Sequence, residues 1–433
     1  MGQNLRARLQ RIRETKKEPV IGIESASDES QVPPVPEAQN HSQLIANSSF
    51  FEAGFQTLKR TTLLDIPLAW AAALPQTLPI LIPDLNPYRR KQNPGQAELT
   101  LNPQDLLFFD LETTGLSGGA GTVAFLAAFG RFVPAGLQID QYLLLDYPGE
   151  GDFLEAALAE FSPPRLIVSY NGKSFDSQIL KTRCLMNGMM PPVYAHADLL
   201  HPARRLWKRV LPDCSQATIE TEILGLDRTG DVPGALAPEI WFNFLKNNDF
   251  APLLEICDHN LRDIRGLAAI FISLCHIAAD PLSAIDTYRV DAEQLALRWR
   301  DAWHSALRRG NDFDDNELRL GEALLELAVA RGGVRAAYVL ALDLIREGKA
   351  DDGRKRLLVL IAGDSQALAG EVKCLALRQL AIDAEWRLRD HKTALAYTEA
   401  ALALENIRES LRHELETRRE RLLSKSNQGL GGE

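Results

Sequence analysis

The sequence predicts an α/β fold in which an antiparallel start of the sheet leads into a parallel continuation, followed by an all-helical region. Three apolar segments joined by short turns precede the first helical pattern, which is typical of a β-meander. After Pro163 and Pro164, short apolar strands alternate with helical patterns as far as about Ala279. From Pro281 onward Gly and Pro become rare and helical periodicity dominates, which indicates a separate helical domain.

The length of 433 residues favours two or three domains. We expect a polar, disordered arm over 1–48, an irregular and proline-rich extension over 49–100, an α/β domain over 101–280 and a helical domain over 281–433. Within the last region, 345–354 and 388–397 both predict a helix, a polar turn and a helix. Their offset of about 43 residues exceeds the 34 of a regular tetratricopeptide unit, so tetratricopeptide-like repeats and a plain helical bundle both fit.

Charge and cysteine content narrow the class of protein. The net charge of -10 disfavours a protein that coats nucleic acid, but it allows an enzyme that grips a few phosphates. The five cysteines are odd in number and widely spaced, which disfavours a disulfide framework or a structural zinc site and indicates a reducing cytoplasm. The most apolar segment, Ile66 to Ile82, is interrupted by prolines and shorter than a typical membrane span, so we expect no membrane insertion.

Two acidic residues lie near the end of the first strand expected in the α/β domain, 106–111. Asp110 and Glu112 are one residue apart, so on a strand their side chains point to the same face. Two carboxylates in one small volume raise each other's pKa unless a cation neutralises them, and such oxygen-rich sites suit Mg²⁺ or Mn²⁺. An exposed strand end would also carry this pair without any function. The next strands are expected at 122–132 and 137–145.

Two further acids follow later in the chain. Asp176 opens a helix soon after a fourth apolar strand at 165–170, at a strand-to-helix turn where polar sites collect. Asp263 lies on a helix with His259 one turn before it, on the face opposite an apolar stripe. Taken alone, Asp176 fits a helix residue favoured by the dipole, and the His259–Asp263 pair fits a surface salt bridge.

Together these residues form three acidic motifs in order: Asp110-Leu-Glu112-Thr-Thr-Gly-Leu, Tyr170-Asn-Gly-Lys-Ser-Phe-Asp176 and His259-Asn-Leu-Arg-Asp263. They resemble the motifs of the DEDD 3'-to-5' exonucleases of the ribonuclease H-like fold, most closely a bacterial YprB-like branch. Further similarity lies in His196-Ala-Asp198-Leu-Leu-His201-Pro-Ala-Arg-Arg-Leu-Trp207 and in Asp231-Val-Pro-Gly234. The resemblance covers about residues 104 to 275 and implies a mixed five-stranded sheet flanked by helices.

The resemblance also implies a site with two Mg²⁺ or Mn²⁺ ions. Asp110 would bridge the ions, Glu112 and Asp263 would hold the ion that binds the attacking water, and Asp176 would support the other. His259 would orient or deprotonate that water. In this family a histidine usually precedes the last acid by five residues and a tyrosine by four, whereas this chain has histidine at the tyrosine spacing. Substrate contacts are expected from Thr113, Gly115, Leu116, Tyr170, Asn171, Phe175, Arg204 and Arg205.

The implied activity is metal-dependent 3'-to-5' hydrolysis of single-stranded DNA or RNA ends, on long substrates or on dinucleotides. The alternative is a catalytically inactive, nuclease-like scaffold that binds nucleic acid, with the C-terminal helices binding a protein partner. The presence of all four acids and a candidate base favours the enzyme. A second metal cluster of His196, Asp198 and His201 is conceivable, but we expect Asp198 to close a strand or cap the next helix instead.

Overall fold

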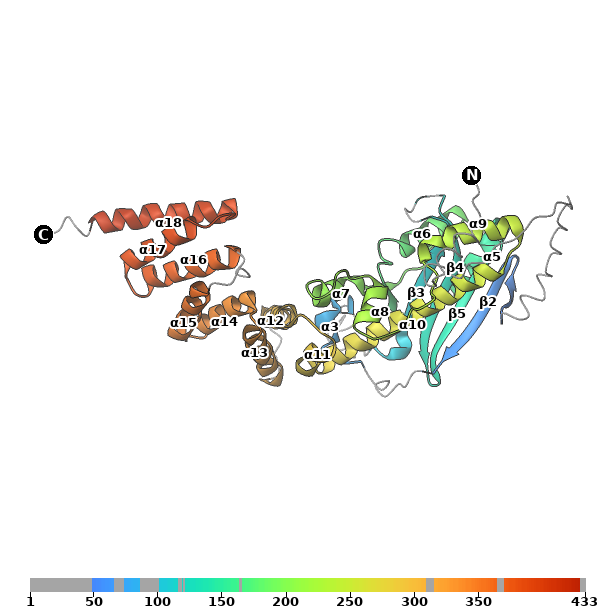
Figure 1. Ribbon diagram of the computed structural model, residues 1–433, viewed down its shortest axis with the longest axis horizontal. Helices are drawn as coiled ribbons and strands as arrows, with labels where there is room; N and C mark the ends of the chain where they lie inside the picture. Colours follow the sequence, from blue (N-terminus) through green and yellow to red (C-terminus); the bar gives the residue numbers. More distant parts are fainter. Residues whose placement is uncertain are drawn as a thin grey trace, which may run out of the picture. The chain divides into compact units, whose positions relative to one another are not determined.

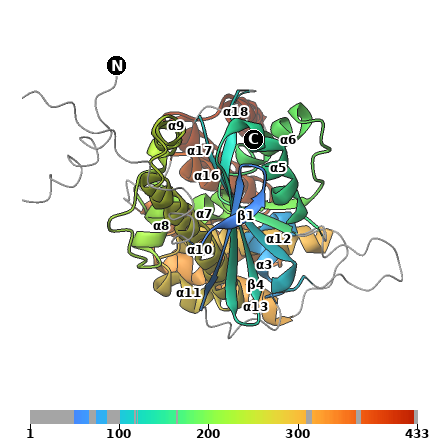
Figure 2. The same ribbon diagram turned by 90° about the vertical axis from the view of Figure 1, so that its right-hand side faces the viewer.

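Residues 49–65, 74–85, 101–115, 119, 121–162, 166–308, 315–363 and 370–428 are described by the computed structural model. Among them, seven strands form one mixed sheet in the order β1-β2-β5-β4-β3-β6-β7 (Figures 1 and 2). The strands are β1 (Phe51–Gly54), β2 (Thr57–Leu64), β3 (Leu106–Thr113), β4 (Ala124–Val133), β5 (Gly136–Leu144), β6 (Leu166–Ser169) and β7 (Ala195–Asp198). The pairs β1–β2, β2–β5, β5–β4 and β4–β3 are antiparallel, whereas β3–β6 and β6–β7 are parallel.

The expected antiparallel start and parallel continuation are therefore confirmed, but the strand number is not. The expectation of five strands is wrong, because β1 and β2 add two strands at the free edge of β5. The expectation of irregular structure over 49–100 is likewise wrong for residues 51–64. The alternation of these short strands is weak, and their pairing depends on β5, which lies about eighty residues further along the chain. The expected arm at 1–48 lies outside the described residues.

Helices cover both faces of the sheet and continue to the C-terminal part of the chain. Those between strands or directly after the sheet are α3 (Leu78–Leu81), α5 (Glu150–Ala159), α6 (Asp176–Met186), α7 (Leu200–Trp207), α8 (Gln216–Glu222), α9 (Ala237–Asn247) and α10 (Ala251–Ala279). The later ones are α11 (Pro281–Thr287), α12 (Ala292–Arg308), α13 (Asp315–Ala330), α14 (Val334–Arg346), α15 (Ala350–Ala362), α16 (Gly370–Trp386), α17 (His391–Leu402) and α18 (Glu409–Gln428). None of the described helices is long and apolar enough to span a membrane.

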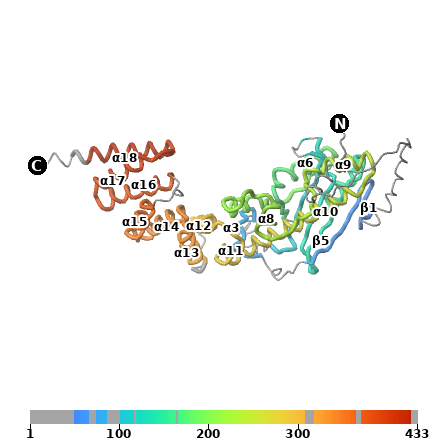
Figure 3. The backbone as a smooth tube through the Cα atoms, viewed as in Figure 1, coloured from blue at the N-terminus to red at the C-terminus, as the bar shows by residue number. Residues whose placement is uncertain are grey.

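α10 packs across β3, β4 and β5, and Figure 3 follows it beside β5. Side chains along β3 point alternately to the two faces of the sheet, so only every second one contacts α10. Phe108 points to α10 and contacts Phe271 with ring centroids 5.8 Å apart, whereas Phe109 packs on Phe161 at the other face. At Gly130 an added Cβ would lie 2.5 Å from Ile264 Cγ2, so glycine lets the helix approach the sheet closely. Because Asp110 shares the face of Phe108, it is also turned toward α10.

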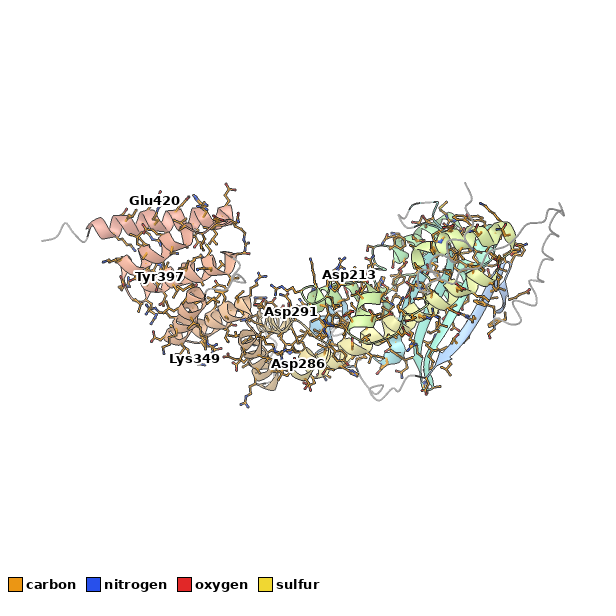
Figure 4. All side chains as sticks on the ribbon, viewed as in Figure 1. Asp213, Asp286, Asp291, Lys349, Tyr397 and Glu420 are labelled. Atoms are coloured by element: carbon orange, nitrogen blue, oxygen red, sulfur yellow. The ribbon has the colours of Figure 1, made fainter. Side chains whose placement is uncertain are left out.

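The later helices pack mainly against their neighbours in the sequence. The turns between α14 and α15 and between α16 and α17 match the two helix-turn-helix stretches expected from the sequence. Asp291 accepts a hydrogen bond from Gln294 N at the start of α12 (Figure 4). Trp207 Nε1 donates to Tyr288 O at 2.9 Å, so α7 is tied to the chain that leads into α12. A tetratricopeptide-like architecture and a protein partner for these helices stay predictions.

Candidate metal centre

Asp110 stands in a row of directly paired residues that crosses four strands. Arg60 of β2 pairs with Gln141 of β5, Gln141 pairs with Ala128 of β4, and Ala128 pairs with Asp110 of β3. Directly paired residues point to the same face of a sheet, so all four face α10. The small Ala128 side chain leaves room above the sheet between Gln141 and Asp110.

Asn260 of α10 fills that room and connects the row. Its Nδ2 donates to Asp110 Oδ2 at 2.7 Å, and its Oδ1 accepts from Gln141 Nε2 at 3.0 Å. Arg60 donates in turn to Gln141 Oε1 from Nε at 2.9 Å and from Nη2 at 2.7 Å. Asn260 and Gln141 are fully buried, and each therefore needs these partners. The chain of hydrogen bonds fixes the orientation of the Asp110 carboxylate.

Glu112, His259 and Asp263 form a group suited to a metal ion. One ligand atom from each lies within 4.8 Å of the other two, and within the described parts of the chain this is the group found. His259 Nε2 is 3.3 Å from Asp263 Oδ2 and 4.0 Å from Glu112 Oε1. The four-residue spacing thus brings the imidazole onto the acids, because positions i and i+4 of a helix lie on one side. The simple surface salt bridge considered for this pair is wrong, since the ring is buried.

Asp176 lies near the other acids, because its charge adds to burial in raising the pKa of Asp110 and of Glu112. Asp176 is the first residue of α6 and is 5% exposed. Its position depends on Gly172, four residues earlier in the chain. A Cβ on Gly172 would lie 2.9 Å from Asp176 Oδ2 and 2.5 Å from Ser169 Oγ. The loop from Tyr170 to Phe175 therefore wraps tightly around this carboxyl group, which a larger residue at 172 would displace.

The four acids repel one another strongly. Burial, followed by the charges of Asp176, Asp263 and Glu112, holds the pKa of Asp110 well above its usual range. Burial, Asp263 and Asp176 do the same to the pKa of Glu112. Burial, with Asp198 as a second cause, raises the pKa of Asp176 to about 7. The structure thus brings together all five residues expected to be catalytic, in an environment that favours binding of a cation.

The other side of His259 faces a loop between α8 and α9. His259 Nδ1 lies 3.0 Å from Asp231 Oδ1, although the alignment of a hydrogen bond is lacking. Arg228 of the same loop forms ion pairs with Glu220, Asp231 and Asp263. The loop between α8 and α9 therefore contacts both His259 and Asp263.

The residues expected to contact the substrate differ in exposure and in what they touch. Thr113 is buried, and its hydroxyl donates to Gly115 O at 2.9 Å, whereas Leu116 lies outside the described residues. The Tyr170 hydroxyl donates to Cys214 O, and burial raises its pKa against the effect of nearby Arg204. Asn171 is exposed, with a left-handed backbone at φ 64°, and Phe175 is half-buried. Arg205 is exposed on α7 and lowers the pKa of Arg298, after the larger effect of burial.

Asp198 ends β7, as expected, and it also supports the turn after β6. Its carboxylate accepts hydrogen bonds from the backbone N of Asn171 at 2.8 Å, of Lys173 at 3.2 Å and of Leu200 at 3.1 Å. His196 lies 2.7 Å from Ser169 Oγ and 3.1 Å from Ser177 Oγ, and burial lowers its pKa to about 4. These residues thus use their polar atoms to hold the loop that carries Asn171.

Sequence reasoning missed several residues that hold the acids. Gln141 occupies the inward position in the apolar alternation Leu137, Ile139, Gln141 and Leu143, and Asn260 lies three residues after Cys257 on the buried side of α10. A polar residue at an expected core position was the available signal, because burial of an amide requires partners. Arg228 and Glu220 gave no such signal, since loop and helix-end charges are usually solvated.

Comparison with known proteins agrees with the geometry. The RNase H superfamily matches residues 107–275. The match spans β3 to β7 and the helices as far as α10, and it supports a ribonuclease H-like fold for this part of the chain. The uncharacterized protein YprB of Bacillus subtilis (strain 168) is 38% identical to the chain over 202 residues, which make up 46% of this chain and 48% of that protein. The chain thus spans about half the length of this relative.

A solved structure, the family B DNA polymerase from the hyperthermophilic archaeon Pyrobaculum calidifontis, shares 20% identity with the chain at a TM-score of 0.30. The match covers 48% of this chain and 29% of the polymerase.

The side chains of this ribonuclease H-like domain fit the divalent cations that such nucleases typically use. Carboxylate oxygens suit Mg²⁺ and Mn²⁺, and an imidazole nitrogen among them shifts the preference toward Mn²⁺. Glu112, Asp263 and His259 supply this mixed set.

Replacing Gly234 with alanine is expected to weaken Mn²⁺ binding by roughly tenfold. The new Cβ would lie 3.1 Å from His259 Nε2 and push the ring away from Glu112 and Asp263. Calorimetric titration of metal-free protein with MnCl₂ measures the effect. Ala235→Ser, a change at the exposed neighbouring position, is the control and should bind like the wild type. Equal affinity in the Gly234→Ala protein would show that Mn²⁺ does not depend on the position of His259.

Proposed function

We propose that the domain is a DEDD-type 3'-to-5' exonuclease that hydrolyses phosphodiester bonds at single-stranded DNA or RNA ends. The observation that carries the proposal is the convergence of Asp110, Glu112, Asp176 and Asp263, from β3, α6 and α10, in one buried site of a ribonuclease H superfamily domain. The 3' direction is inferred from the resemblance of the three acidic motifs and their order.

The four acids and the imidazole would hold the divalent cations. Bound Mg²⁺ or Mn²⁺ supplies an activated water at neutral pH and neutralises the charge that develops on the leaving oxygen. Asp110 is suited to a central role because Asn260 fixes one of its oxygens by a bond of 2.7 Å, so the other keeps a defined direction. Glu112 and Asp263 would act with His259, which lies next to both.

The remaining candidate residues would orient the substrate. His259 Nε2 faces the acids, so the ring is placed to accept a proton there or to bind metal. The half-buried ring of Tyr170 would stack on a terminal nucleotide, and the exposed amide of Asn171 would form hydrogen bonds with it. Arg204 lies near Tyr170 and is exposed, so it would contact a phosphate of the entering strand.

A direct test is to incubate purified protein with end-labelled single-stranded DNA and RNA, with and without Mn²⁺, and to resolve the products on a sequencing gel. We expect a metal-dependent ladder that recedes from the 3' end on 5'-labelled substrate. Dinucleotides in the same assay determine whether short substrates are preferred. Internal cuts would indicate an endonuclease, and binding without cleavage would indicate a scaffold.

A further inference from the structure

Arg228 joins the loop between α8 and α9 to the acids of the site. Its guanidinium contacts three carboxylates, those of Glu220, Asp231 and Asp263, and its side chain is 13% exposed. Buried ion pairs of this kind contribute little to stability relative to apolar residues of similar size. Because burial of these charges costs desolvation free energy, we infer that the ion pairs serve to fix the geometry of the site.

The carboxylate of Glu220 packs against α10 in the space that Gly266 leaves open because it has no side chain. Gly266 lies one turn after Asp263, and a Cβ there would come within 1.7 Å of Glu220 Oε1. Gln216 Nε2 donates both to Glu220 Oε1 at 2.8 Å and to the backbone O of Asp263 at 2.7 Å. The carboxylate of Glu220 is thus locked against the same helix turn as Asp263, and it holds Arg228 by two of the guanidinium nitrogens.

Arg228 in turn restricts Asp263 and Asp231. Its Nη2 binds Asp263 Oδ1, so Oδ2 of that carboxylate is turned toward His259 Nε2 at 3.3 Å. Its Nη1 donates to Asp231 Oδ2 at 3.1 Å, while Asp231 Oδ1 accepts from Arg262 at 2.8 Å and lies 3.0 Å from His259 Nδ1. Asp231 therefore packs against the Nδ1 side of the ring and limits the directions in which Nε2 can point.

We propose that Arg228, gripped by Glu220 in the niche of Gly266, is the positioning residue of the metal site: it sets the Asp263 carboxylate directly and the His259 ring through Asp231. The inference rests on the proposed function in assuming that these groups bind a divalent cation. Arg228 would not touch the substrate, because its nitrogens are taken up by carboxylates.

Mn²⁺ binding without any nucleic acid provides the first measurement. In Arg228→Met we expect Mn²⁺ affinity to fall by about tenfold to a hundredfold. Electron paramagnetic resonance of bound Mn²⁺ should show nitrogen coupling from His259 in the wild type and a changed coupling in the variant. Arg228→Lys, which keeps the charge but cannot bridge three carboxylates, should bind Mn²⁺ with intermediate affinity. Arg265→Met, at an exposed arginine of α10, is the control and should bind like the wild type.

Steady-state kinetics then separate positioning from substrate contact. At saturating Mn²⁺, Arg228→Met should lower kcat by more than tenfold and leave KM for oligonucleotide nearly unchanged. A raised KM with unchanged kcat would overturn the proposal, because it would place Arg228 on the substrate. Unchanged Mn²⁺ affinity and an unchanged spectrum would also overturn it. The Mn²⁺ affinity and the spectrum test the role of Arg228 even if the domain hydrolyses no nucleic acid. The cleavage assay alone tests the exonuclease proposal, so the two proposals can fail independently.

If Arg228→Met does not fold, Glu220→Gln tests the same link. Glutamine keeps the shape that fills the Gly266 niche but removes the charge that grips Arg228. We expect weaker Mn²⁺ binding, by about tenfold, with a melting temperature close to that of the wild type. Mn²⁺ affinity equal to that of the wild type in this folded variant would overturn the proposal.

Discussion

Asp110→Asn is expected to reduce metal-dependent hydrolysis of nucleic acid by about a thousandfold or more while leaving the fold intact. The substitution removes the carboxylate whose charge the buried site requires, but it keeps a side chain of the same shape that can still accept from Asn260. Burial and then the charges of Asp176, Asp263 and Glu112 raise the pKa of Asp110, so its replacement also removes a buried charge that these acids repel. We therefore expect the metal-free variant to melt a few degrees above the wild type.

The measurement combines single-turnover cleavage of end-labelled oligonucleotide with thermal unfolding in a chelator. Asp286→Asn is the control, since Asp286 lies on α11 outside the site with a side chain that is 78% exposed. That variant should cleave at the wild-type rate. Wild-type cleavage by Asp110→Asn would contradict the assignment of the four acids. A melting temperature lower than that of the wild type would contradict the inferred repulsion between Asp110 and the other three acids.

The second large effect is a fall in the stability of the metal-free protein as the pH rises. The carboxyls of Asp110, Glu112 and Asp176 have raised pKa values in the fold, so the folded chain binds their protons more tightly than the unfolded chain. For such groups stability is greatest below the usual carboxyl range and is lost as the pH rises toward the folded pKa, which for Asp176 is about 7. Metal-free protein should therefore melt at a lower temperature at pH 8 than at pH 5.5.

Saturating Mn²⁺ should reverse this loss, because the cation binds the ionised acids of the folded chain. We expect Mn²⁺ to raise the melting temperature at pH 8 by roughly 5 °C or more, and by less at pH 5.5, where protons compete. Asp110→Asn should show a smaller pH dependence and a smaller shift with Mn²⁺. Differential scanning calorimetry in chelator and in MnCl₂ at the two pH values provides the data. A melting temperature that responds to neither pH nor Mn²⁺ would argue against a metal site.

Local signals in the sequence predicted the elements and the acids well. The apolar run before Asp110 became β3, the run before Tyr170 became β6, and Asp176 opens α6 as the strand-to-helix turn indicated. These signals are short-range: alternation, turn residues and helix spacing depend on neighbours in the chain. The ribonuclease H-like fold expected from the three motifs is confirmed, because motif order reflects the order of the strands and helices that carry them.

What the sequence alone determined is the set of chemical groups and the faces from which they point: two acids on one face of a strand, one at a helix start, and a histidine and an acid one turn apart. Tertiary structure decided the rest. Pairing of β2 with β5 added strands to the sheet, the row from Arg60 to Asp110 placed Gln141 under Asn260, and Gly266 made room for Glu220. Each of these depends on residues far apart in the chain, whose contact yields energy only after the core has packed, so no local pattern encodes them.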